Sequence, residues 1–201
     1  MKPQLWICAG PNGAGKSTLV AERNDGRLPI VNPDIIAAQS PGMAPIAAGR
    51  EALAQQKALI EAKQSFIVET TLSGRREVEL MKTAKAAGFK VNLAYVGVDE
   101  PMTSMFRVGI RVQAGGHNVP PEDIARRFQR SLNNLAPAMA VADRSYVLDN
   151  TTKKQRLILV QDEGRVRAVS RSIPAWAKPN LDKSVRQGFA KSRERKEDRG
   201  R

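Results

Sequence analysis

The 201-residue sequence predicts a single α/β domain, a three-layer sandwich around a mostly parallel β-sheet. Short apolar runs alternate with helix-compatible segments from residue 4 to about residue 150, which is the pattern of strands joined by helical crossovers. A glycine-rich loop stands between the first apolar run and the first helical segment. Hydrophobic residues make up 41% of the chain, so a chain of this length can bury one core but falls short of two ordinary domains.

The first half of the chain alternates strand and helix. Residues 5–8 form an apolar run that predicts the first strand, and residues 16–23 are helix-compatible directly after the glycine loop. A brief apolar piece at residues 28–31 follows. The other elements of this half are an Ala-, Gln- and Lys-rich helix, an apolar strand and a helix closed by a glycine, at residues 44–63, 66–68 and 75–87 with Gly88.

The second half continues the alternation and ends in a hairpin. A strong strand over residues 91–98 precedes a helix over residues 102–112 and a loop over residues 114–121. The next helix begins near Pro120 or Pro121, with acidic residues in its first turn that suit the helix dipole. Its buried face consists of Ile124, Phe128, Leu132 and Leu135. The remaining strands are predicted at residues 146–148, 157–160 and 166–169, the last two around Glu163 and Gly164.

Charge is concentrated toward the end of the chain. The formal net charge is +13, and residues 176–201 hold nine Lys/Arg and four Asp/Glu with few apolar residues. We expect residues 1–172 to form the domain and residues 173–201 a basic, partly disordered tail. The charge favours anionic partners such as nucleotides, nucleotide-sugars or nucleic acid. The tail can simply be solvated, and the alternative is that it binds RNA.

The sequence predicts a cytoplasmic protein without membrane contact. No run of eighteen or more apolar residues occurs, and the first residues lack the basic and apolar regions of a secretory signal. Cys8, the single cysteine, lies in an apolar run. It is expected to be buried filler, since one cysteine allows neither an internal disulfide nor a thiolate metal site.

The stretch "AGPNGAGKST" at residues 9–18 fills the pattern G-x-x-x-x-G-K-S/T of a P-loop. Glycines let backbone N–H groups approach phosphates, the lysine meets the β and γ charges, and the hydroxyl after it reaches Mg²⁺. The sequence therefore predicts ATP (or GTP) and Mg²⁺ as cofactors, with Ser17 on the metal. The predicted nucleotide-binding residues are Gly10, Asn12, Gly13, Ala14, Gly15, Lys16, Ser17 and Thr18.

Two short motifs after the P-loop carry acceptor-type chemistry. Asp34 in "NPD" follows Lys16 by eighteen residues, where a carboxylate can take the proton of an acceptor hydroxyl. Its alternative role is an N-cap of a helix over "IIAAQ". Glu69, Thr70 and Thr71 end a strand, and a carboxylate with two hydroxyls suits the hydroxyls of a sugar. Helix capping by Thr71 or Ser73 is the alternative there.

Arginines are frequent beyond residue 100. Arg107 and Arg111 are four residues apart and share a helix face. On the next helix, Arg127 lies closer to the apolar stripe than Arg126 and Arg130, so it is predicted to face a cleft and they to face solvent. Such charges stabilise a transferring phosphoryl group, often from a lid. Exposure at the surface is the alternative for each of them.

One histidine and two further motifs complete the candidates. His117, in the loop "GGHNVP", stands without acidic or cysteine neighbours, so a catalytic metal site is not expected. His117 can either contact phosphate from a lid or be an ordinary loop residue, and both readings stay open.

The stretches "LSGRRE" at residues 72–77 and "VGVDEP" at residues 96–101 resemble the signature loop and Walker B strand of ABC transporter ATPases. The first lacks its second glycine, and it follows the P-loop by only about sixty residues.

Taken together, "GPNGAGKST", "NPD", "ETTLSG", the Arg107/Arg111 pair and "GGHNVPPEDIARR" resemble the zeta toxin family, in particular its short bacterial members, also described as predicted ABC-type ATPases. The resemblance covers residues 4–150. It implies a P-loop kinase fold of the nucleoside and shikimate kinase type with a helical lid. For the best known members it implies ATP-dependent phosphorylation of the amino-sugar 3′-hydroxyl of UDP-N-acetylglucosamine.

The resemblance also implies residue roles. Lys16 and Ser17 would hold ATP and Mg²⁺, and Asp34 would be the base. Glu69 and Thr70 would contact the sugar nucleotide, and Arg111 would act on the phosphates. The second lid arginine of the family has no unambiguous match, with His117 and Arg127 standing nearest. The resemblance also implies an antitoxin protein as a possible partner.

We therefore expect a kinase whose acceptor is a hydroxyl of a nucleotide-sugar or nucleotide-like metabolite, with UDP-N-acetylglucosamine first. Two alternatives stay open. One is a nucleic-acid-directed P-loop protein that uses the basic tail, although nine aromatic residues offer few stacking platforms. The other is an ABC-type ATPase that hydrolyses ATP without an acceptor and depends on Glu100.

Overall fold

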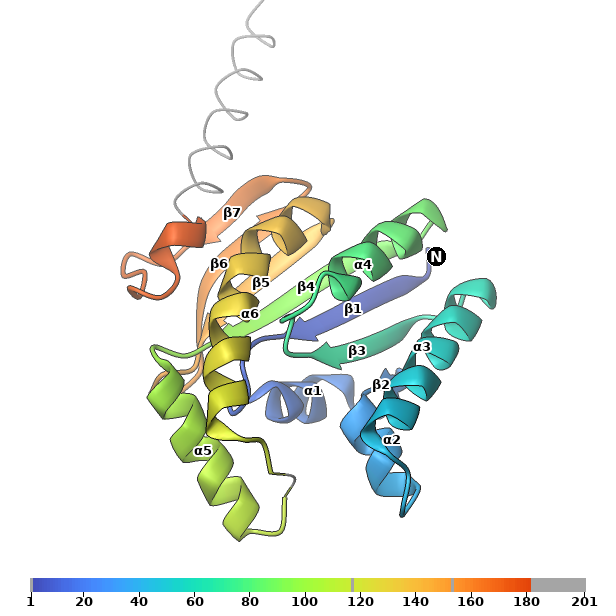
Figure 1. Cartoon of the computed structure of the whole chain (residues 1–201). Coiled ribbons are helices and arrows are strands. Elements are labelled where there is room, and N and C mark those ends of the chain that lie inside the picture. Colours follow the sequence, from blue (N-terminus) through green and yellow to red (C-terminus); the bar gives the residue numbers. More distant parts are fainter. Residues whose placement is uncertain (1, 117, 153, 182–201) are drawn as a thin grey trace, which may run out of the picture.

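The computed structural model describes residues 2–116, 118–152 and 154–181 (Figure 1). Its centre is one seven-stranded sheet with the order β2-β3-β1-β4-β5-β6-β7. The strands are β1 (Gln4–Ala9), β2 (Ile30–Val31), β3 (Phe66–Thr70), β4 (Lys90–Gly97), β5 (Arg144–Asp149), β6 (Arg156–Asp162) and β7 (Arg165–Val169).

In the part of the chain that the structure describes, six helices lie between the strands. They are α1 (Lys16–Asn24), α2 (Pro33–Gln39), α3 (Pro45–Glu61), α4 (Arg76–Ala86), α5 (Pro101–Gln113) and α6 (Pro121–Val141). Helices lie on both faces of the sheet. On β4, Tyr95 faces α6, where its Oη lies 3.0 Å from Ser131 Oγ, whereas Cys8 on β1 faces α1, its Sγ 3.7 Å from the carbonyl oxygen of Lys16. The predicted three-layer α/β sandwich is confirmed.

The first five strands in the sheet order, β2, β3, β1, β4 and β5, are parallel. β6 and β7 add an antiparallel hairpin next to β5. The hairpin turns at Glu163 and Gly164, as the sequence predicted. In the register of β1 and β3, Ala9 lies opposite Thr70. Because parallel strands end at the same edge, the loop after β1 and the residues after β3 lie side by side there, where ligands of such sheets bind.

The chain continues to pack against the core beyond β7. Trp176, Ala177 and Leu181 are buried in the main hydrophobic cluster, and the ring of Trp176 lies 6.1 Å from that of Tyr95. The sequence assigned these residues to the basic tail, so the packed part of the chain extends past the predicted boundary at residue 172. The rest of the predicted tail, residues 182–201, lies outside the described residues. Within the described residues, no helix is long and apolar enough to span a membrane.

Candidate functional site

The loop between β1 and α1 has the backbone that its glycines allow. Gly10, Gly13 and Gly15 have φ angles of 140°, 67° and 92°, values that favour glycine. A Cβ at Gly10 would lie 2.0 Å from the carbonyl oxygen of Val96, and one at Gly15 would lie 2.5 Å from Asn150 Nδ2. The loop leads directly into α1, whose N-terminus is suited to bind a phosphate.

Lys16 places a cation at the base of this loop. Its side chain is buried, and Nζ donates a hydrogen bond of 2.8 Å to the carbonyl oxygen of Pro11. Burial lowers the pKa of Lys16, an effect that the charge of Glu69 opposes. Nearby, the buried Oδ1 of Asn12 has no hydrogen-bond partner in the described part of the chain, and such a group is normally satisfied by water or a ligand. The loop therefore has the charge and geometry to receive a phosphate chain.

Ser17 and Glu69 meet across the ends of α1 and β3. Ser17 Oγ donates a 2.6 Å hydrogen bond to Glu69 Oε1, and Glu69 is buried. Among residues 2–116, 118–152 and 154–181, no three His, Cys, Asp or Glu side chains cluster as a metal site. Mg²⁺ in kinases needs only one or two protein oxygens, because substrate phosphates and water complete its shell. The Ser17 hydroxyl and the Glu69 carboxylate fit that requirement.

Asp34 lies in the first turn of α2 and not at its cap. Asn32 is the N-cap, and its Oδ1 accepts a 2.8 Å hydrogen bond from the backbone N–H of Asp34. The alternative in which Asp34 caps this helix is wrong, because Asn32 already fills that position. The Asp34 side chain is exposed and lines the same cavity as Lys16 and Glu69.

The threonines after β3 make local contacts. Thr70 Oγ1 donates to Glu77 Oε1 at 3.0 Å, and Thr71 Oγ1 lies 2.9 Å from Ser73 Oγ. Neither Thr71 nor Ser73 caps α4, whose N-cap is Arg75 without a side-chain hydrogen bond. Thr70 thus ties the end of β3 to α4, and both threonines line the cavity.

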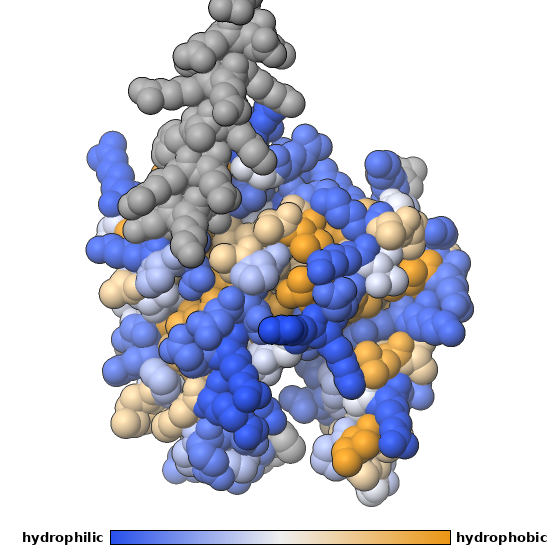
Figure 2. Space-filling view, turned by 45° about the horizontal axis from the view of Figure 1, so that its top comes forward, coloured by the Kyte–Doolittle hydropathy of each residue, from blue (hydrophilic) through white to orange (hydrophobic). Residues whose placement is uncertain are grey.

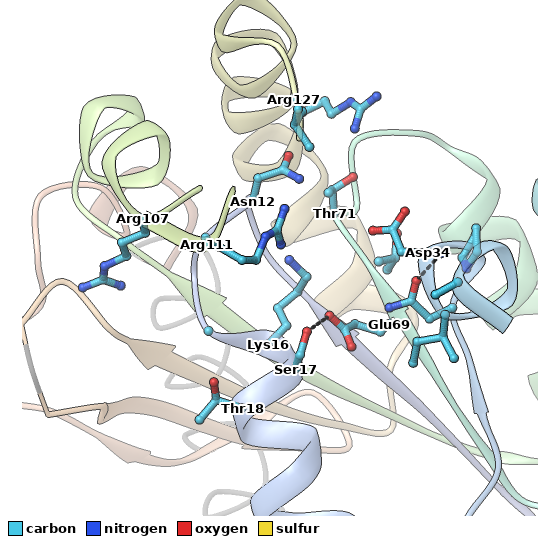
Figure 3. Close-up of a pocket in the computed structure, with 18 residues that line it drawn as sticks. Asn12, Lys16, Ser17, Thr18, Asp34, Glu69, Thr71, Arg107, Arg111 and Arg127 are labelled. Carbon is cyan, nitrogen blue, oxygen red and sulfur yellow. Dashed lines mark hydrogen bonds between the residues drawn. The ribbon is translucent and has the colours of Figure 1, made fainter. Parts of the chain in front are cut away.

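The predicted arginines fall into two groups. Arg107, Arg111 and Arg127 line the cavity, whereas Arg126 and Arg130 are exposed on α6. Figure 3 shows Arg111 directed toward Lys16 and Arg107 directed away from it. Arg127 also pairs with Asp123, at 3.5 Å. His117 lies outside the described residues.

The cavity has a volume of about 700 Å³ and opens between α2 and α5 (Figure 2). It brings together side chains from the P-loop, α2, the end of β3, α5 and α6. A second cavity of about 690 Å³ adjoins it between α3 and α4, and the two share Pro33, Glu69 and Thr70. Of the predicted site residues, the first cavity is lined by Asn12, Gly13, Gly15, Lys16, Ser17, Thr18, Asp34, Glu69, Thr70, Thr71, Arg107, Arg111 and Arg127.

Asp99 and Glu100, the acidic residues of the Walker B-like stretch, lie outside the cavity. Asp99 Oδ1 accepts hydrogen bonds from Thr103 Oγ1 and from the backbone N–H of Glu100, at the start of α5. Both acidic side chains are exposed, and neither lines the cavity. The carboxylate that reaches Ser17 is Glu69 on β3.

The turn after β5 contacts the P-loop, and the sequence did not predict this contact. Asn150 Nδ2 donates a 2.8 Å hydrogen bond to the carbonyl oxygen of Ala14 in the P-loop, and the backbone N–H of Asn150 donates to Gly97. The only sequence signal was that polar residues follow a strand whose end was predicted at this sheet edge. No local pattern indicates which of them touches the P-loop.

The chain is similar in sequence to known proteins. A protein-family model described as "Zeta toxin" matches residues 47–161. An uncharacterised protein of Haemophilus influenzae is 34% identical over 139 residues, which cover 64% of this chain and 99% of that protein.

Two solved structures share the fold. One is a crystal structure of AvrRxo1-ORF1:-ORF2 with ATP, at a TM-score of 0.69 and 16% identity over 92% of this chain. This chain spans 64% of that one's length. The other belongs to the PezAT toxin-antitoxin system of Streptococcus pneumoniae, at a TM-score of 0.58 and 17% identity, covering 77% of this chain and 73% of that one. With the family model matching more than half of its residues, the chain belongs to the zeta toxin family, with a P-loop kinase-like fold.

Proposed function

We propose that the protein is a kinase that transfers the γ-phosphoryl group of ATP to a hydroxyl of a nucleotide-sugar, with UDP-N-acetylglucosamine as the first candidate. One observation carries the proposal. The buried cation of Lys16 and the exposed carboxylate of Asp34 line the same cavity. A phosphate donor and a hydroxyl acceptor can therefore meet between them.

The P-loop residues are assigned to the donor. Backbone N–H groups of the glycine loop and the N-terminus of α1 receive the phosphates, and Lys16 meets their charge. Mg²⁺ is assigned to Ser17 with Glu69 beside it, where the ion would neutralise charge on the phosphoryl oxygens. An ATP complex of a structurally similar protein supports ATP as donor.

Asp34 is assigned the role of base. Its carboxylate takes the proton of the acceptor hydroxyl as the oxygen attacks phosphorus, and the bond to ADP breaks on the opposite side. Arg111 is assigned the role of stabilising charge on the phosphoryl group during transfer, and its direction toward Lys16 supports this. Arg127 is a further candidate for this role on the α6 side.

The adjoining cavity supports an acceptor larger than a simple sugar. Its volume is about 690 Å³, and it shares the lining residues Pro33, Glu69 and Thr70 with the first cavity, so a nucleotide-sized molecule bound there would lie close to Asp34. The walls combine apolar and charged side chains, as ligand pockets commonly do. They include Ala52, Leu53, Lys57, Ile60, Arg76 and Leu80.

A kinase of ATP and nucleotide-sugars belongs in the cytoplasm, where both are found. An antitoxin partner is supported by the toxin-antitoxin system to which one structurally similar protein belongs.

ADP release tests the proposal against an ABC-type ATPase. Wild type and Glu100→Gln are incubated with ATP and Mg²⁺, with and without UDP-N-acetylglucosamine. We expect ADP release to rise at least about tenfold with the acceptor, and to be equal in the variant, because Glu100 lies outside the cavity. Release that is independent of any acceptor and lost in Glu100→Gln would favour the ATPase.

A further inference from the structure

The loop after β3 contains a strained residue, Leu72. Its φ angle is 57°, in the left-handed region that residues other than glycine rarely adopt. Three other described non-glycine residues have a positive φ, but they are polar and stand at a helix end or in the hairpin turn: Asp25, Lys63 and Glu163. Leu72 is instead fully buried. Because its conformation costs free energy, the surrounding structure must hold it, and such residues often stand at functional sites.

Asn134 on α6 fastens the backbone of this loop. Its Nδ2 donates a hydrogen bond of 2.9 Å to the carbonyl oxygen of Leu72 and one of 3.1 Å to that of Gly74. The backbone N–H of Leu72 donates to Thr70 Oγ1 at 3.1 Å. Both polar backbone groups of Leu72 therefore have a partner, and one side-chain amide joins the loop to a helix 62 positions further along the chain.

The two fastened carbonyl groups flank Ser73, which contacts Thr71. Ser73 Oγ lies 2.9 Å from Thr71 Oγ1. Thr71 lines the first cavity together with Asp34. Because Thr71 stands between the end of β3 and the fastened part of the loop, the direction of its hydroxyl depends on where Asn134 holds Leu72 and Ser73.

Asn134 lies on the same face of α6 as Arg127. The two residues are seven positions apart on this helix, which is close to two full turns. Arg127 also lines the first cavity. One helix thus carries a cavity-lining arginine and the residue that fastens the loop of Thr71.

We propose that Asn134 is a positioning residue for the acceptor. Its two hydrogen bonds hold the loop of residues 71–74 so that the Thr71 hydroxyl meets a hydroxyl of the acceptor bound at Asp34. The inference rests on the proposed function for the place of the acceptor. A hydroxyl such as that of Thr71 can both donate and accept, and a small displacement of a positioning contact lowers the rate of transfer strongly.

Two variants remove the amide donor. Asn134→Ala deletes it, and Asn134→Asp keeps the shape of the side chain but turns an oxygen toward each carbonyl group. Asn133→Ala is the matched control, because Asn133 is the neighbouring asparagine of the same helix, is exposed, and accepts a hydrogen bond from Gln129 of that helix. For each full-length protein, kcat and KM are measured with UDP-N-acetylglucosamine and other nucleotide-sugars, and the Kd for ATP by calorimetry.

We expect kcat/KM for the acceptor to fall between about 10- and 100-fold in both Asn134 variants, while the Kd for ATP stays within about twofold. Asn133→Ala should stay within about twofold of wild type in both quantities. A purely structural role would lower the unfolding temperature and leave kcat/KM unchanged below it. That result in a folded Asn134→Ala or Asn134→Asp, or an equal loss of ATP binding, would overturn the proposal.

Amide hydrogen exchange without any acceptor separates this proposal from the proposed function. The backbone amides of residues 72–74 should exchange at least about threefold faster in Asn134→Ala than in wild type, with the P-loop amides unchanged. Equal exchange of the loop in the two proteins would overturn the proposal. A wild type that phosphorylates no nucleotide-sugar would count against the proposed function, whereas faster exchange of the loop in the variant would still support Asn134 as the residue that holds it.

Discussion

The charged side chain of Lys16 is buried. Its Nζ donates a hydrogen bond to the carbonyl oxygen of Pro11, and the carboxylate of Glu69 lies nearby. A buried cation is costly unless paired. The depressed pKa of Lys16 expresses that cost, and a bound triphosphate would relieve it with negative charge. The proposed role of Lys16 in binding phosphates therefore comes at the expense of stability.

Replacing Lys16 with methionine tests this account. Phosphoryl transfer should fall at least about 100-fold, because the cation facing the phosphates is lost. The free energy of unfolding, from urea denaturation, should be unchanged or higher, since a buried charge has been removed. Retained turnover would contradict the role of Lys16, and a large loss of stability would contradict the stated cost.

At the scale of elements, the order of strands decides where the site lies. β1 and β3 are parallel neighbours, so the P-loop after β1 and Glu69 near the end of β3 meet at one edge. The short strand β2 ends just before Asn32 and delivers Asp34 to the same edge.

Most of these elements could be predicted from the sequence, because apolar periodicity, Gly88 and the P-loop pattern are local signals. The contacts of Asn150 and Trp176 could not, since they join residues 136 and 27 positions from their partners. The start of the predicted tail packs against the core, and composition could not reveal this. Residues 173–201 are basic and polar as a whole, but Trp176, Ala177 and Leu181 among them are buried.

Truncation distinguishes the packed C-terminal segment from the residues after it. A chain that ends at residue 181 should keep the unfolding free energy of the full chain, since the removed residues are mostly polar. A chain that ends at residue 173 should lose roughly 3 to 5 kcal/mol, because Trp176 and Leu181 leave the core. Urea denaturation of both gives the comparison. Equal stability of the two shortened chains would contradict the packing described.

For the whole molecule, charge and shape together favour an anionic substrate. The net charge is +13, the face shown in Figure 2 is largely hydrophilic, and the cavity opens between α2 and α5. A positive field raises the encounter rate with nucleotides and with nucleic acid alike. Only the cavity, with Asp34 at one side and Lys16 at its base, favours a small-molecule kinase over the nucleic-acid-directed alternative.

The most direct test of that claim is mass spectrometry of a panel of nucleotide-sugars incubated with ATP, Mg²⁺ and either wild type or Asp34→Asn. We expect a product heavier by one phosphoryl group, with UDP-N-acetylglucosamine the first candidate acceptor. It should form at least about 100-fold more slowly with Asp34→Asn. Nucleotide binding should be retained in that variant. Absence of product from every uridine-linked sugar would contradict the proposed substrate, and a variant as fast as wild type, with chemistry limiting the rate, would contradict Asp34 as the base.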